Sequence, residues 1–303
     1  MLNPILAFSA TRRMRSFRTM LIAIGYVAAL LALALAFLGP FLSSSLYLNT
    51  MRMGPLCYLA LLAAQFGLII LIAPAMTSAS VAGERERQTL DLLLVTNTGS
   101  FRIVMGKVME SFAVLALLIV CGLPVMSLCI LTGGVSLWHI LIGELFLLAE
   151  AFACVSIGVF CSSLSRSTVL SGVLSYLLIL LIGVVTALPF LLGYPQRITD
   201  VVYDRAGYAA LTESGARAMI SPLLYLNPGF GLMCLAQGEL HVFSSYAENL
   251  GWGRILCTWL MADRAGWIFI ALACSAGMLL ISVALILLSA GMIRKGNKAI
   301  KNS

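Results

Sequence analysis

Acidic residues and histidines are the side chains of this sequence that could do chemistry, and their spacing does not favour catalysis. His139 and His241 are the two histidines, and neither has serine, aspartate or cysteine neighbours at the spacing of a hydrolase triad or a metal site. Glu144 and Glu150 lie on one predicted helix, but six residues turn a helix by about 600°, so the two side chains point roughly 120° apart. They cannot act as a facing acid pair. The sequence predicts no catalytic residue and no metal site.

The eight cysteines show no CxxC motif and no Cys/His ligand spacing. Six of them lie in apolar runs and are interpreted as packing residues: Cys57, Cys121, Cys129, Cys154, Cys161 and Cys274. The other two, Cys234 and Cys257, lie in a more polar part of the chain, where an oxidising compartment would permit a disulfide.

A nucleotide-binding loop is also missing from the sequence. Gly99 and Gly106 are too far apart for a Walker A motif, and Lys107 is followed by valine instead of serine or threonine. We therefore expect no ATP hydrolysis by this chain alone and no cofactor bound to it.

Long apolar runs dominate the chain. Hydrophobic residues make up 61% and charged residues 10%, against about 45–50% and 25% in soluble domains. The sequence predicts an all-α polytopic membrane protein with six transmembrane helices, because six runs are long enough to cross a bilayer once the flanks of the third and fourth are added. These runs cover about 19–39, 55–80, 111–135, 151–165, 167–192 and 267–292.

Basic residues cluster at alternate ends of these runs. The net charge of +7 is therefore interpreted as a topology signal instead of a nucleic-acid site. The positive-inside rule places both termini in the cytoplasm, and all four tryptophans then fall at or beyond the outer ends. The basic residues on the inner side are Arg12, Arg13, Arg15, Arg18, Arg85, Arg87, Arg102, Lys107, Arg166, Arg294, Lys295, Lys298 and Lys301. Residues 293–303 form a cytoplasmic tail, and residues 1–18 are predicted to form a basic, amphipathic elbow helix on the inner leaflet.

The densest charge cluster lies between the second and third runs, over residues 82–100. Gly83 is expected to end the preceding helix, Glu84 and Glu86 to lie in the first turn of a new one, and Ser100 to cap the next. Leu90, Leu93 and Leu94 follow at helical spacing. On these residues alone, the segment is either an interfacial helix that lies flat at the headgroups or a rigid helix that receives force from a soluble partner.

The run from Gly83 to Leu94, followed by Ser100 and Gly106-Lys107, resembles the cytoplasmic loop of ABC-2 type exporter permeases, which reads E-[KR]-E-x-G-T-L-x-x-L-L, then Ser/Thr, then G-K. Gln88 stands where that pattern has glycine, and Asn97-Thr98 where it often has Thr-Pro. The motif covers about a tenth of the chain, and the layout of six spans extends the resemblance to nearly all of it.

The resemblance implies a single transmembrane domain over 1–303 in the cell membrane, coupled through a cytoplasmic loop at 82–106. It implies two separate ATPase subunits, which hold ATP and Mg²⁺, and a second permease chain, identical or related. The coupling residues implied are Glu84, Arg85, Glu86, Arg87, Leu90, Leu93 and Leu94. The alternatives from other classes are an ATP-independent channel or secondary transporter, and a membrane anchor without transport activity. The sequence does not identify the cargo.

The largest segment predicted outside the membrane covers about 193–265. Its stretch from Leu223 to Ala236 is apolar but too short to cross, and Asn227-Pro228-Gly229 is expected to interrupt it, so it should re-enter the outer leaflet or lie on the surface. In ABC-2 permeases, broken helices at this place roof the translocation path, which makes Pro222, Asn227 and Pro228 external gate candidates. An inert lid remains the alternative.

Three acidic residues fall within the predicted spans. Glu110 is expected to pair with nearby Lys107 or to extend toward the headgroups. Glu150 lies near the midplane, where an ionised side chain is costly, so it should be protonated, bonded to a neighbouring helix or open to a wet cavity. For Glu144 and Glu150 an interhelical hydrogen bond and a role in the translocation path both stay open.

Overall fold

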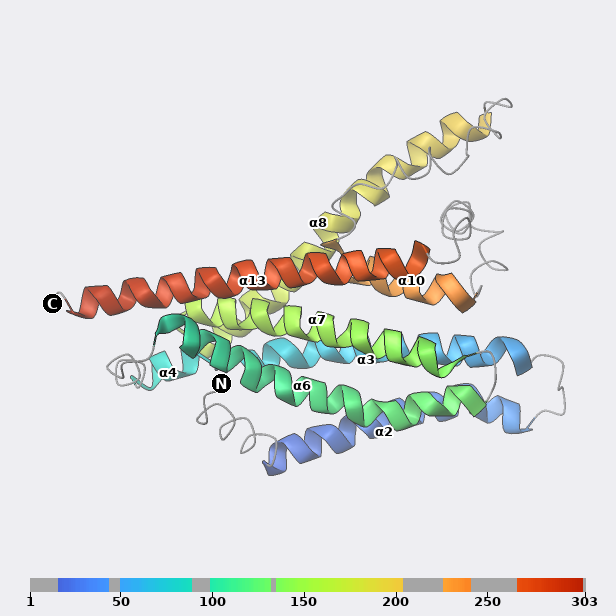
Figure 1. Ribbon diagram of the computed structural model, residues 1–303, viewed down its shortest axis with the longest axis horizontal. Coiled ribbons are helices and arrows are strands. Elements are labelled where there is room, and N and C mark those ends of the chain that lie inside the picture. The colour runs from blue at the N-terminus through green and yellow to red at the C-terminus, as the bar shows by residue number, and fades with distance from the viewer. Residues whose placement is uncertain are drawn as a thin grey trace.

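The computed structural model describes residues 16–43, 50–88, 99–131, 135–203, 226–240 and 266–301 (Figure 1). Within these ranges the regular structure is helical, and six helices are long and apolar enough to cross a membrane. They are α2 (Phe17–Ser43), α3 (Thr50–Thr77), α6 (Ser100–Leu131), α7 (Leu137–Leu164), α8 (Thr168–Tyr203) and α13 (Gly266–Lys301). Two shorter helices are α4 (Ala82–Glu86) and α10 (Pro228–Leu240). The predicted all-α fold with six spans is confirmed.

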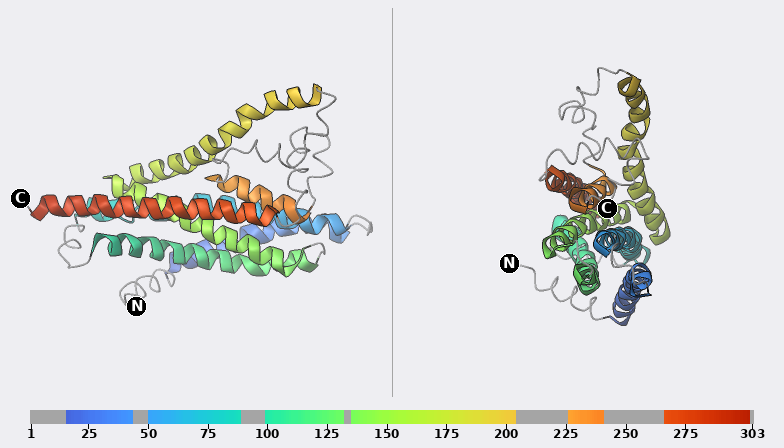
Figure 2. Two further views of the ribbon diagram at one scale, coloured as in Figure 1. Left: turned by 45° about the horizontal axis from the view of Figure 1, so that its top comes forward. Right: turned by 90° about the vertical axis from the view of Figure 1, so that its right-hand side faces the viewer.

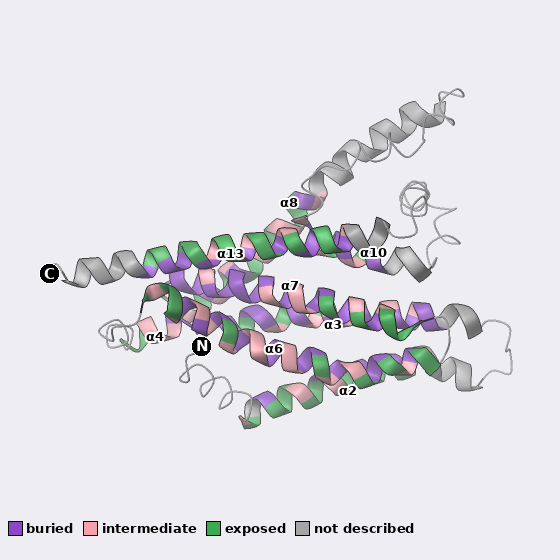
Figure 3. Ribbon diagram, viewed as in Figure 1, coloured by how far each residue is buried: buried purple, intermediate pink, exposed green. Residues whose placement is uncertain are grey.

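The centre of the bundle is α7, which packs against α3, α6, α8 and α13. Buried residues make up 67% of its most apolar stretch, and purple residues follow it along its length in Figure 3. Two glycines let α3 approach closely: a Cβ at Gly143 would lie 2.3 Å from the Tyr58 hydroxyl, and one at Gly158 would lie 1.9 Å from Thr77 Oγ1. Small residues at such crossings are typical of membrane helix packing.

At the edge of the bundle, α8 starts next to α4 and α7 and then diverges from the other helices (Figures 1 and 2). Only 11% of its membrane-crossing stretch is buried. Figure 2 shows α8 on the side of α3, while α6 and α13 lie toward the opposite side. One side of the bundle is therefore formed by α8 and α3, and the opposite side by α6 and α13.

The third and fourth spans include the flanks that the sequence analysis adds to their apolar runs. The fourth span begins at Leu137, so the flank added to the apolar run at 151–165 is part of the helix, and Glu144 and Glu150 are buried inside the bundle. Similarly, α6 begins at Ser100, so the third span starts well before its apolar run at 111–135.

Polar residues at the helix starts act as caps. Ser16 Oγ accepts a hydrogen bond from the Thr19 amide at 3.2 Å, one turn into α2. At the start of α7, Ser136 and His139 form a capping box, in which His139 Nδ1 accepts from the Ser136 amide at 3.0 Å. His139 thus has a local structural role.

The short helix α10 starts where the sequence predicts an interruption. Asn227 Oδ1 accepts a hydrogen bond from the Phe230 amide at 3.1 Å, and Pro228 is the first helical residue. Asn-Pro is therefore a cap followed by a proline at N1. The predicted interruption of the stretch 223–236 falls at the start of this helix, and residues 223–225 lie outside the described ranges. The helix packs against α13 and α3, and a Cβ at Gly231 would lie 2.7 Å from the Phe146 ring and 3.1 Å from Cys274.

Several predictions concern residues outside the described ranges: nearly all of the elbow helix at 1–18, Pro222, and the pairing of Cys234 with Cys257. Cys234 itself is a buried free thiol.

Candidate functional site

The short helix α4 lies at the end of the bundle where α3 and α7 end and α6 and α8 begin (Figure 1). The hydroxyl of Ser162, near the end of α7, holds the turn that leads into it. Ser162 Oγ accepts from the amides of Val81 and Ala82, at 3.0 and 2.9 Å, and donates to the Ser78 carbonyl at 2.9 Å. Because these are all the hydrogen bonds that one hydroxyl readily makes, Ser162 joins this turn firmly to α7.

Two charges of α4 bind the adjoining ends of α7 and α8. The Arg85 guanidinium donates to the carbonyl oxygens of Ser165 and Ser163, at 2.9 and 3.2 Å. Glu86 Oε1 accepts from the backbone amide of Thr168 at 2.9 Å and from its hydroxyl at 3.3 Å. The cation therefore lies at a helix C-terminus and the carboxylate at a helix N-terminus, and each sign complements the helix dipole there.

A third charge connects α4 to α6. The Glu84 carboxylate accepts a hydrogen bond from Lys107 Nζ in an ion pair, with both side chains about a fifth to a quarter exposed. The sequence indicated Glu110 as the neighbour of Lys107 and missed Glu84, which is 23 residues away along the chain. With this contact α4 is bound to three membrane-spanning helices through three consecutive residues.

Such contacts add little to global stability, because partly exposed ion pairs contribute about 0–1 kcal/mol each. Their geometric effect is larger. A displacement of α4 has to move the ends of α6, α7 and α8 or break charged hydrogen bonds. We define Glu84, Arg85, Glu86, Lys107, Ser162 and Thr168 as the α4 junction.

The chain leaves the junction through Arg87 and Gln88, which are both exposed. Gln88 has φ 57°, a left-handed backbone conformation that favours glycine. The glycine of the ABC-2 loop pattern falls at this position, so the structure gives a physical reason for that glycine. Leu90, Leu93 and Leu94 lie outside the described residues, and their coupling role stays a prediction.

The predicted helix boundary at Gly83 is wrong. Helix α3 ends at Thr77, and Gly83 lies within α4. A Cβ at Gly83 would be 3.3 Å from Ala79 Cβ and 3.5 Å from Thr168 Cγ2, so glycine allows close packing on α8 at this position. Glu84 lies in the first turn as expected, whereas Glu86 is the last residue of the helix.

The two intramembrane glutamates on α7 have different neighbours. Glu144 is 5% exposed and lies close to Gln65 of α3 and Tyr26 of α2, which are also buried. A Cβ at Gly122 would lie 2.1 Å from Gln65 Nε2, so this glycine makes room for the amide. The carboxyl of Glu144 and the amide of Gln65 are therefore buried next to each other where α3 and α7 pack together.

Glu150 is fully buried, near the thiols of Cys154 and Cys274. Both of its carboxylate oxygens lack a hydrogen-bond partner in the part of the chain that the structure describes. The interhelical hydrogen bond considered from the sequence is therefore not formed there.

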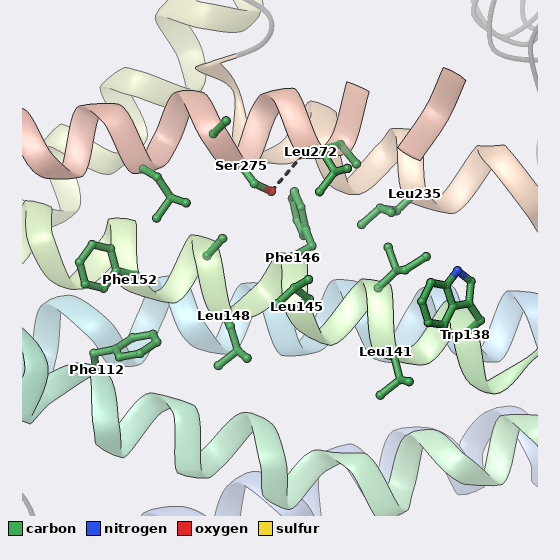
Figure 4. Close-up of a pocket in the computed structure, with 15 residues that line it drawn as sticks. Phe112, Trp138, Leu141, Leu145, Phe146, Leu148, Phe152, Leu235, Leu272 and Ser275 are labelled. Carbon is green, nitrogen blue, oxygen red and sulfur yellow. Dashed lines mark hydrogen bonds between the residues drawn. The ribbon is translucent and has the colours of Figure 1, made fainter. Parts of the chain in front are cut away.

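An apolar groove lies along α7, between α6, α10 and α13 (Figure 4). Its volume is about 950 Å³. The sequence did not indicate it, because its wall consists of ordinary apolar residues whose contacts depend on how three helices cross.

Of the external gate candidates, Asn227 has a defined role. Its side-chain Nδ2 donates to the Gly183 carbonyl of α8 at 3.0 Å, in addition to capping α10. It therefore links α10 to the fifth span, and Pro228 starts the helix that it caps.

Comparison with known proteins identifies the family of this chain. No curated protein matches the chain. The model of the ABC-2 family transporter proteins matches residues 60–292, from α3 to near the end of α13. This match covers more than two thirds of the sequence and includes the α4 junction, so the chain belongs to the ABC-2 family of transporter proteins.

Proposed function

We propose that the chain is the permease subunit of an ATP-driven exporter and forms half of its translocation pathway. The observation that carries this proposal is the α4 junction. Three consecutive charged residues of α4, Glu84, Arg85 and Glu86, contact α6, α7 and α8 respectively. A partner that pushes on α4 acts on three spans at once.

The ATPase contact follows from what the junction leaves exposed. Arg87 and Gln88 are exposed at its end, and the leucines at 90, 93 and 94 come directly after them. Two ATPase subunits, which hold ATP and Mg²⁺, bind this surface and one like it on a second permease. Their closure moves the junction, and the spans change between inward-open and outward-open states because the ATPases contact α4 differently in each.

This function sets the orientation. The α4 end of the bundle, at which α13 also ends (Figure 1), faces the cytoplasm, because the ATPases are there. Both termini are then cytoplasmic and the protein is a multi-pass component of the cell membrane. The basic residues at this end agree with the positive-inside rule.

The second permease, an identical or related chain, packs along α8. Support comes from exposure: large apolar side chains such as Val169, Val173 and Leu180 are 74%, 59% and 63% exposed on this helix. Two chains then enclose the path between their α8 sides.

The test uses the permease purified with its ATPase in lipid nanodiscs. Reversal of the exposed charge, Arg87→Glu, should weaken ATPase binding, whereas Arg85→Ala should leave the ATPase bound but remove the effect of the permease on ATP hydrolysis. Arg102→Glu is the matched control, because Arg102 is an exposed basic residue in the first turn of α6. Unchanged binding in Arg87→Glu together with unchanged hydrolysis in Arg85→Ala would argue against the proposal.

A further inference from the structure

The apolar groove beside α7 has the form of a site for a single hydrocarbon chain. Four helices line it, with α7 as one wall and α13 facing it (Figure 4). Its lining includes Phe112 of α6, Trp138, Leu145 and Phe152 of α7, Leu235 of α10 and Ser275 of α13.

The lining offers almost no polar group to a ligand. Ser275 has a hydroxyl, but it donates to the Ala271 carbonyl of its own helix at 3.0 Å. The Trp138 indole N–H lies near the start of α7, at the end of the groove. A charged or peptide ligand would lose its hydrogen bonds to water in the groove without replacement. An alkyl chain makes no hydrogen bonds to water and therefore loses none when it enters the groove.

The groove also has the length and direction of a lipid tail. Trp138 and Phe152 are 14 residues apart along α7, or about 21 Å at 1.5 Å per residue, and half of a bilayer including its headgroup region is about 20–22 Å thick. Since α7 crosses the membrane, the groove runs along the direction of the acyl chains. Trp138 lies at the helix end, at the level where tryptophan is enriched near headgroups.

Its inner end is closed by two aromatic rings. Phe112 and Phe152 pack edge to face, with ring centroids 5.4 Å apart and an interplanar angle of 86°. The groove is therefore bounded at its inner end as well as along its sides, unlike the exposed surface of a single helix. It is also separated from the proposed permease interface, since α6 and α13 lie away from the α8 side of the bundle (Figure 2).

We propose that this groove binds one acyl chain of a bilayer phospholipid, which enters sideways from the leaflet on the Trp138 side. The headgroup stays at the level of Trp138 and the tail extends toward Phe112 and Phe152. The site does not depend on the ATPase or on the direction of transport, so it is tested separately from the proposed function.

The test uses the full chain in nanodiscs that contain a phosphatidylcholine with a photoactivatable diazirine in its acyl chain. Labelling should concentrate on α7 and α13 around the groove and should saturate. Leu145→Trp fills the groove from an exposed position. It should remove the saturable labelling there, because the indole takes the volume that the acyl chain would occupy.

The matched control is Leu280→Trp. Leu280 is 72% exposed and Leu145 is 62% exposed, so neither change should affect folding, and Leu280 does not line the groove. Labelling spread evenly over all exposed helices, or unchanged by Leu145→Trp, would overturn the proposal. Efficient disulfide crosslinking between two copies through Leu145→Cys would overturn it too, because a second chain would then occupy the groove.

Discussion

Gln88 adopts a left-handed backbone at the end of the α4 junction, with φ 57°. Glycine reaches this conformation without the steric cost of a Cβ, and β-branched residues reach it least easily. We expect Gln88→Gly to slow amide hydrogen exchange in α4, by the equivalent of about 0.5–1 kcal/mol, and Gln88→Val to speed it. Faster exchange in Gln88→Gly would show that the glutamine side chain stabilises this turn.

Ser162 accepts hydrogen bonds from two backbone amides and donates one to a backbone carbonyl at the turn before α4. Ser162→Ala leaves two buried N–H groups without an acceptor and should cost about 1–3 kcal/mol. Ser156→Ala is the control, because that buried hydroxyl bonds only to Phe152 of its own helix. Thermal unfolding of the purified variants measures the difference, and equal melting temperatures would contradict the role given to Ser162.

Glu150 is a buried carboxyl without a hydrogen-bond partner among the described residues. Removing such a group should not destabilise the protein, so Glu150→Met should assemble at least as well as the parent chain. Leu147→Ala, at a fully buried position, should cost about 2–5 kcal/mol and shows that the assay detects a loss. If Glu150→Met assembles but no longer transports, the carboxyl acts in the translocation path. If it fails to assemble, the carboxyl has a structural role.

At the scale of the elements, the contact between α3 and α7 depends on Gly158. A Cβ there would lie 1.9 Å from Thr77 Oγ1 and 2.8 Å from Thr77 Cβ, close to the backbone of α3. Gly158→Ala should therefore force the two helices apart and cost about 1–3 kcal/mol.

Gly67→Ala is the matched change on α3, since a Cβ at Gly67 meets nothing within 4 Å. It should leave stability unchanged or raise it by up to about 1 kcal/mol through helix propensity. Denaturation of both variants in the same detergent gives the comparison. Equal stability of the two would mean that α3 and α7 are not held together at Gly158.

For the whole molecule, the sequence predicts the number of spans because apolar runs are local signals. An apolar run alone is too short for the fourth span, because α7 continues through the buried Glu144 and Glu150, and its flank had to be added. It cannot predict the junction contacts, because Arg85 and Glu86 bind residues about 80 positions away. Asn227-Pro228 shows a different limit, since the same two residues are compatible with a break or with the start of a helix.

The orientation of the whole protein in the membrane can also be tested. A single cysteine at Asn49 in a cysteine-free background should react with a membrane-impermeant reagent added outside intact cells. A cysteine at Gln88 should react only after permeabilisation, because the positive-inside rule places it in the cytoplasm. The reverse labelling would invert the topology and remove the ATPase contact.

In the proposed mechanism, α4 passes an ATP-dependent movement to the spans through its charged contacts. Exchange of the Glu84 and Lys107 charges tests this transmission most directly. Spin labels at Phe101 of α6 and Val169 of α8, both exposed, report the distance between these helix ends in the complex with the ATPase. We expect ATP to change this distance in the parent protein, Glu84→Lys or Lys107→Glu to suppress the change, and the double exchange to restore it. An unaltered response in both single variants would contradict this mechanism.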